Sequence, residues 1–130
     1  EKTRRAWGRL SDSGIPLGIQ MVLLSGVNND CSTVLALNRE LLRTRVRPYY
    51  IFHPKSVQGT MHFQCPLAKG LEIMEFLRGR LSGLGIPTYV INSKGGMGKV
   101  PILPNYVITR DEGKIALRTW ENKCVKMDID

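Results

Sequence analysis

The chain has 130 residues, which suits one small domain and is too short for a large enzyme. Apolar residues make up an ordinary 42%, and no apolar run is long enough to span a membrane. The net charge of +8 suits an anionic ligand, a nucleic acid or a solvated surface. Aromatic residues are only 7% and no basic run is interleaved with them, so nucleic-acid binding is not favoured.

Three cysteines, Cys31, Cys65 and Cys124, are widely spaced and form neither a CxxC pair nor a disulfide framework. This usage indicates a reducing compartment, and we expect the protein to be cytoplasmic. The chain begins at Glu1 rather than Met, and we expect both of its ends to be cuts through a longer polypeptide.

Helical spacing and apolar runs alternate along the chain. In order, the pattern predicts a helix over 4–14, a strand over 17–24, a helix over 31–45, a strand over 46–53, a helix over 66–85 and a strand over 87–92. A glycine-rich loop follows, and residues 106–120 are expected to form a β-hairpin that turns at 111–113.

Apolar strands that alternate with helices predict an α/β fold built from parallel β/α units. These units fit either an open doubly wound sheet or a slice of a β/α barrel. In both architectures ligands bind at the C-terminal ends of the strands. The site is therefore expected among the loops 25–30, 53–63 and 92–105.

The loop "INSKGGMGKVPILPNY" (91–106) places Lys99 directly after a glycine cluster. Ser93 and Val100 occupy positions where a P-loop requires glycine and Ser or Thr, so this loop is not a P-loop. A lysine here is a phosphate contact, a Schiff-base lysine or an exposed loop residue. For the first two, the backbone N–H groups of Gly95, Gly96 and Gly98 could cradle an anion.

Four segments together resemble the lysine 2,3-aminomutase family: "GIPLGIQMVLLSGVNNDC" (14–31), "RVRPYYIFHPKSVQGTMHF" (45–63), "CPLAKGLEIMEFLRG" (65–79) and "GGMGKVPILPNYV" (95–107). Members of this family are radical S-adenosylmethionine enzymes that also use pyridoxal phosphate. The resemblance implies the C-terminal slice of a partial TIM-like barrel over 1–105, followed by a C-terminal hairpin extension over 106–130. It also implies a homo-oligomer.

The resemblance assigns cofactor roles to several residues. Lys99 matches the lysine that joins pyridoxal phosphate, with the three loop glycines around the cofactor. Gln20 matches a position near the S-adenosylmethionine site, although it also suits a polar residue lining the barrel. Cys31 matches a zinc-binding cysteine, or is only a small residue at a helix start. The CxxxCxxC motif that binds the 4Fe-4S cluster is absent from these residues and is expected upstream.

The resemblance also bears on the substrate. Enzymes specific for lysine carry aspartates where this chain has Lys55 and Asn92. A cation and an amide suit a substrate carboxylate, so the resemblance implies conversion of L-glutamate to β-glutamate by radical amino migration. His53 and His62 are interpreted as loop hydrogen-bonding residues. Two alternatives are an aminomutase for another amino acid and a non-catalytic phosphate- or nucleic-acid-binding α/β module.

Overall fold

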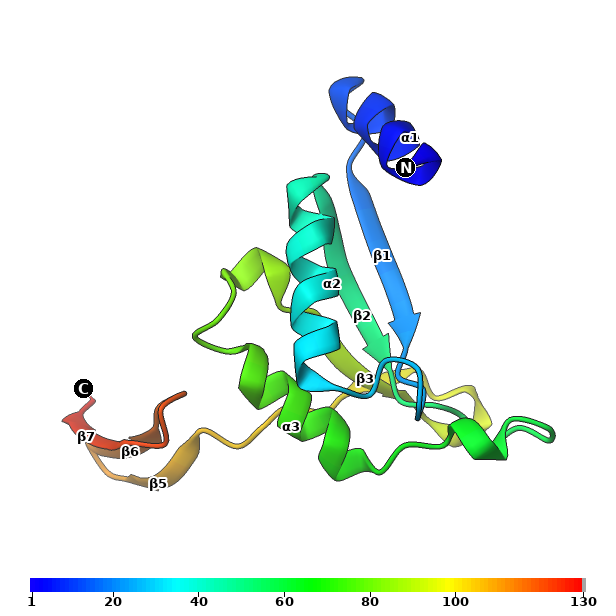
Figure 1. Ribbon diagram of the computed structural model, residues 1–130. Coiled ribbons are helices and arrows are strands. Elements are labelled where there is room, and N and C mark those ends of the chain that lie inside the picture. The colour runs from blue at the N-terminus through cyan, green and yellow to red at the C-terminus, as the bar shows by residue number, and fades with distance from the viewer. Residues whose placement is uncertain (130) are drawn as a thin grey trace.

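The computed structural model describes residues 1–129 as a mixed α/β chain with two separate sheets (Figure 1). Its helices and strands, in chain order, are α1 (Lys2–Asp12), β1 (Leu17–Val22), α2 (Cys31–Arg43), β2 (Val46–Phe52), α3 (Leu67–Leu77), β3 (Thr88–Asn92), β4 (Lys99–Pro101), β5 (Val107–Asp111), β6 (Lys114–Arg118) and β7 (Cys124–Asp128). None of the helices within residues 1–129 is long and apolar enough to cross a bilayer.

The larger sheet has the order β1-β2-β3-β4. β1 pairs with β2 and β2 pairs with β3 in parallel, whereas β4 is antiparallel to β3. The parallel β/α units and the α/β class predicted from the sequence are therefore confirmed. The sheet does not close into a barrel within residues 1–129, and the barrel slice stays a prediction.

The core lies between this sheet and the helices α2 and α3. Its buried side chains come from both layers and include Val34, Ile51, Ile73, Leu77 and Tyr89. Burial of one such apolar side chain contributes about 1.5–3 kcal/mol. This packing holds α2 and α3 on one face of the sheet, and it holds β2 and β3 side by side so that the loops after them meet at the same edge.

Two expectations about element boundaries are corrected by the structure. The helix predicted over 66–85 ends at Leu77, because Arg78 is extended and Gly79 has a φ of +75°. The segment 83–85 forms only a short 3-10 turn. The glycine-rich loop also contains the short strand β4, which the sequence pattern did not indicate.

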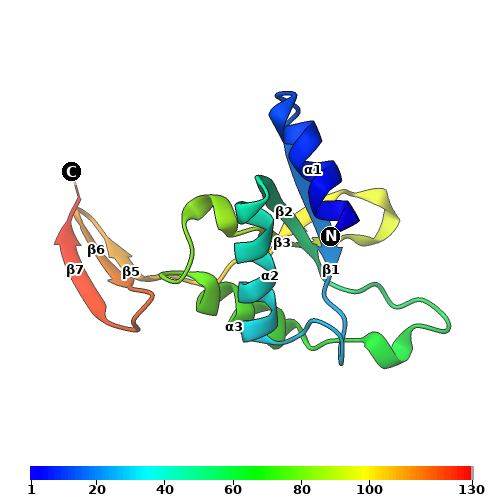
Figure 2. The same cartoon turned by 45° about the horizontal axis from the view of Figure 1, so that its top comes forward.

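The C-terminal segment is a three-stranded sheet rather than a hairpin. β5 and β6 form the expected hairpin, and β7 adds a third antiparallel strand on the other side of β6. Figure 2 shows this sheet standing to one side of the larger sheet. Arg118 of β6 fastens it to the rest of the chain, because its guanidinium donates to the carboxylate of Glu75 on α3 and to the carbonyl of Asn105.

Candidate functional site

A hollow of about 690 Å³ lies where β2 and β3 end. Its walls are the exit of β2 (53–56), the end of β3 (91–92) and the glycine loop up to Lys99. The structure therefore brings together Lys55, Asn92 and Lys99, three predicted site residues from separate segments of the sequence. Their roles remain predictions, but their convergence is an observed property of the fold.

The lining of this hollow is cationic. Among residues 1–129, three lysines contribute to it, Lys55, Lys94 and Lys99, and no aspartate or glutamate does. Amide and hydroxyl groups from Asn92 and Ser93 add neutral polar atoms. Such a set attracts phosphate and carboxylate groups and disfavours a ligand ammonium.

The position of Lys99 follows from strand pairing. Asn92, at the end of β3, lies directly opposite Lys99, the first residue of β4, so the loop 93–98 joins two cross-strand neighbours. Ser93 closes this loop because both its backbone N–H and its hydroxyl donate to the carbonyl of Gly98, at 3.0 and 2.9 Å. Asn92 and Lys99 are therefore held beside each other by backbone geometry.

The glycines of the loop are required for their backbone conformation. Gly95, Gly96 and Gly98 have φ values of +68°, +74° and +94°, a region that residues with a Cβ adopt at a cost. An added Cβ would meet nothing within 4 Å at any of the three. Their role in the fold is to turn the chain, and the space beside them stays open to a ligand.

The ammonium of Lys99 lies over an aromatic ring of β2, which is separated from β4 by β3 in the sheet. Its Nζ is 5.8 Å from the ring centroid of Tyr50, within the range of a cation–π interaction. Tyr50 in turn packs edge-on against Phe52 of the same strand. This contact directs the Lys99 side chain across β3 towards β2.

The segment that carries Lys55 is anchored at its backbone. The side-chain amide of Gln64 donates to the carbonyl of Lys55 at 2.8 Å. Lys55 itself is exposed, so its ammonium can reach a ligand in the hollow. No sequence pattern indicated that Gln64 would hold this segment.

His53 also lines the hollow, and it has a buried partner. Its Nδ1 lies 2.7 Å from the hydroxyl of Tyr89, a core residue of β3 that is 0% exposed. Burial raises the pKa of Tyr89 to about 12 and lowers the pKa of His53. Both groups are therefore neutral near pH 7. The sequence indicated only a loop hydrogen bond for His53, because nothing in the pattern revealed a partner 36 residues away.

The remaining predicted site residues lie elsewhere. Gln20 is exposed on β1, opposite Tyr50, and does not line the hollow. His62 packs against Phe63. Cys31 begins α2, and its thiol lies 3.6 Å from the carboxylate of Glu72. Burial and the nearby Glu72 carboxylate raise the pKa of the Cys31 thiol, and residues 1–129 contain no group of three potential metal ligands.

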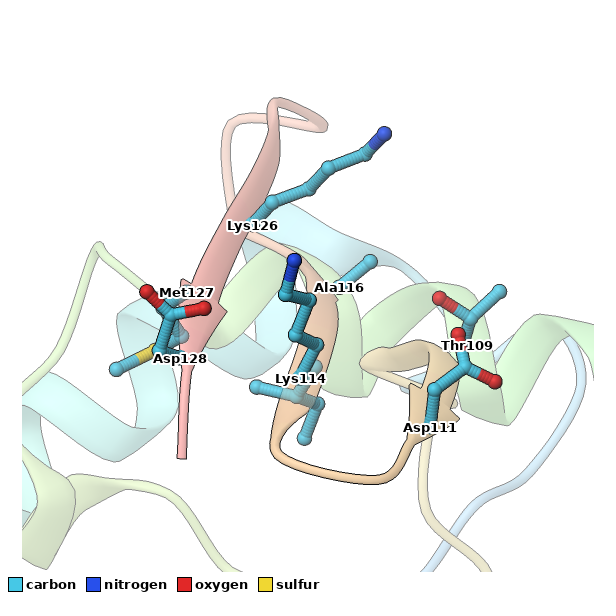
Figure 3. A pocket seen from close by; sticks show the side chains of 8 residues that line it. Thr109, Asp111, Lys114, Ala116, Lys126, Met127 and Asp128 are labelled. Carbon is cyan, nitrogen blue, oxygen red and sulfur yellow. The ribbon is translucent and has the colours of Figure 1, made fainter. Parts of the chain in front are cut away.

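A second hollow, of about 330 Å³, lies on the C-terminal sheet (Figure 3). The carboxylates of Asp111 and Asp128 lie on either side of Lys114, and Lys126 extends from β7. Because this hollow is lined by two aspartates as well as two lysines, it does not favour the binding of an anion. The strand-end hollow is therefore the better candidate for an anionic cofactor and substrate.

Comparison with known proteins points to one family. A family model described as Lysine-2,3-aminomutase matches residues 74–126. The chain is 49% identical over 128 residues to the glutamate 2,3-aminomutase of Clostridioides difficile (strain 630), covering 98% of the chain and 30% of that relative. It is 46% identical over 128 residues to the L-lysine 2,3-aminomutase of Acetoanaerobium sticklandii, covering 98% of the chain and 31% of that relative. It is 46% identical over 121 residues to the L-lysine 2,3-aminomutase of Clostridium subterminale, covering 93% and 29%. The chain thus spans about a third of the length of these relatives or less.

Proposed function

This chain belongs to the lysine 2,3-aminomutase family, and from that membership we propose that it is the pyridoxal phosphate- and substrate-binding part of an amino-acid 2,3-aminomutase. The observation that carries the proposal is the strand-end hollow, which residues 1–129 line with three lysines and no carboxylate. The S-adenosylmethionine and 4Fe-4S chemistry of the family would be completed by residues outside this chain.

The residues of the hollow fit pyridoxal phosphate. Lys99 offers an amine at the mouth of a glycine loop whose inner side is open, and Lys94 offers positive charge for a phosphate. When bound, this cofactor activates the substrate amine for migration between neighbouring carbons. Lys99 would hold the cofactor covalently, and its placement opposite Asn92 would keep it beside the substrate subsite.

We propose L-glutamate as the substrate. Lys55 and Asn92 contribute an ammonium and an amide to one hollow, and both can donate to the side-chain carboxylate of glutamate. A hydrogen bond to a charged group contributes about 1.5–3 kcal/mol. At about 1.4 kcal/mol per tenfold, this favours glutamate over an uncharged analogue by roughly ten- to a hundredfold. A lysine side chain would instead place its ammonium against Lys55.

The proposal also covers the setting of the protein. The three cysteines are free thiols, which fits a reducing compartment such as the cytoplasm. We propose that the complete protein is a homo-oligomer. Cys31 would contribute to a zinc site only together with ligands from outside the described residues, and Gln20 would face S-adenosylmethionine only in the complete protein.

The test is turnover by the complete protein with pyridoxal phosphate, S-adenosylmethionine and reductant. The unaltered protein is expected to convert glutamate faster than lysine. The double variant Lys55→Asp with Asn92→Asp should lose most glutamate turnover, because two carboxylates would repel the substrate carboxylate. Lys126→Asp, on the C-terminal sheet, is the control for a lost positive charge and should retain turnover. Glutamate turnover that survives in the double variant would contradict the substrate assignment.

A further inference from the structure

We propose that His53, oriented by the hydroxyl of Tyr89, is a third specificity-determining residue that donates a hydrogen bond from its Nε2–H to the side-chain carboxylate of the substrate. This inference rests on the proposed function and deepens it. It is carried by the buried contact between Tyr89 and His53 and by the place of His53 in the wall of the hollow.

The Tyr89 hydroxyl is confined within the core. Its ring is 0% exposed and lies against α3 at Gly70, where an added Cβ would come within 2.2 Å of Cζ. Within residues 1–129, the polar partner of its Oη is Nδ1 of His53, at 2.7 Å. A buried hydroxyl hydrogen without an acceptor is costly, so Tyr89 must donate to His53 rather than accept from it.

This direction of donation selects the tautomer of His53. When Nδ1 accepts the Tyr89 proton, a neutral imidazole carries its own hydrogen on Nε2. The two nitrogens point to different sides of the ring, so a ring held at Nδ1 by the core presents Nε2–H away from the core. His53 lines the hollow and is only partly buried, which leaves this second nitrogen within reach of a ligand.

The location of His53 relates it to the proposed carboxylate subsite. His53 and Lys55 are two residues apart where the chain leaves β2, with Pro54 between them, and both line the same hollow. A neutral N–H beside the Lys55 ammonium can bond a carboxylate but has nothing to offer a substrate ammonium, which is itself only a donor. His53 would thereby favour glutamate without adding a further charge.

Three variants distinguish the orientation of the His53 ring by Tyr89 from the hydrogen bond that His53 donates to the substrate. His53→Leu removes the donor, His53→Gln keeps an amide N–H near the position of Nε2, and Tyr89→Phe removes only the orienting hydroxyl. In the complete, cofactor-loaded protein we expect KM for glutamate to rise by ten- to a hundredfold in His53→Leu, with a much smaller change in kcat. His53→Gln should recover most of this loss, and Tyr89→Phe should raise KM by three- to tenfold.

Tyr106→Phe is the matched control, because it deletes a buried tyrosine hydroxyl that has no hydrogen-bond partner within residues 1–129 and lies outside the hollow. It should leave KM and kcat within twofold of the unaltered values. The inference is overturned if the protein turns over glutamate and KM in His53→Leu stays within twofold, or if only kcat falls. A His53→Gln variant as impaired as His53→Leu would also overturn it.

Equilibrium binding of glutarate, a dicarboxylate without an amine, separates this inference from the proposed reaction. Calorimetric titration should show binding that weakens at least tenfold in His53→Leu and recovers in His53→Gln, whether or not the protein turns over glutamate. Absence of glutarate binding to the unaltered protein, or equal binding to it and to His53→Leu, would refute the role of His53. Absence of turnover with intact glutarate binding would refute only the proposed reaction.

Discussion

Replacing Gly70 by alanine perturbs the packing that positions Tyr89 and, through it, His53. The added Cβ would lie 2.2 Å from Cζ and 2.3 Å from Oη of Tyr89. Because Tyr89 is 0% exposed, its ring is enclosed by other residues and cannot turn into solvent without displacing them. The helix or the ring must shift, and either movement changes the contact with His53.

The expected cost follows from two opposing contributions. Overpacking a well-packed core costs typically about 1–3 kcal/mol. Replacing a helical glycine by alanine gains about 1 kcal/mol in helix propensity. We therefore expect Gly70→Ala to lower the free energy of unfolding by up to about 2 kcal/mol. Gly8→Ala in α1, where a Cβ meets nothing within 4 Å, should show only the gain.

Urea unfolding of the complete protein, followed by tryptophan fluorescence, measures both variants. Gly70→Ala combined with Tyr89→Leu closes a double-mutant cycle, and it should show a coupling of at least about 1 kcal/mol because the shorter side chain relieves the contact. If Gly70→Ala is as stable as Gly8→Ala, the close packing of Gly70 and Tyr89 does not exist, and the orientation of His53 loses its structural basis.

Two further predictions concern local structure. Hydrogen bonds from the Ser32 hydroxyl and the Thr33 amide lower the pKa of Asp30, the N-cap of α2, from 3.8 to about 2. The ionised carboxylate therefore stabilises the folded protein fully above pH 3.8, and this stabilisation is lost as the pH falls through about 2. In acid unfolding, the Asp30→Asn variant should lack this loss of stability. Gly98→Ala forces a residue with a Cβ to a φ of +94°, at a cost of about 1–2 kcal/mol, and should lower the affinity for pyridoxal phosphate measured by visible absorbance. Met97→Ala, at an exposed position with a φ of −75°, should leave that affinity unchanged.

The three parallel strands were predictable because each is a short apolar run followed by turn residues. The helix predicted over 66–85 was too long, because the apolar spacing continues past Leu77 whereas the helix ends there. The reason lies outside the local pattern. Gly79 adopts a positive φ and packs against Trp120, with an added Cβ 2.3 Å from the indole. A contact between residues as far apart in the sequence as Gly79 and Trp120 produces no periodic pattern from which it could be predicted.

The convergence of Lys55, Asn92 and Lys99 was predictable because the carboxyl ends of parallel strands meet at one edge of a sheet. The role of His53 was not, since it depends on a hydroxyl from β3 and on the absence of a side chain at Gly70. The strand β4 was missed because it has only three residues, and it is the pairing of β4 with β3 that places Lys99 opposite Asn92.

The covalent position of the cofactor decides whether Lys99 is the lysine that joins pyridoxal phosphate. The complete protein is loaded with pyridoxal phosphate, reduced with borohydride and digested, and the modified peptide is sequenced by mass spectrometry. The structure offers three lysines in one hollow, so the result discriminates among them. We predict that the pyridoxyl group is attached to Lys99. Attachment to Lys55 or Lys94 would contradict this assignment, because it would place the cofactor where the substrate carboxylate or the phosphate is expected.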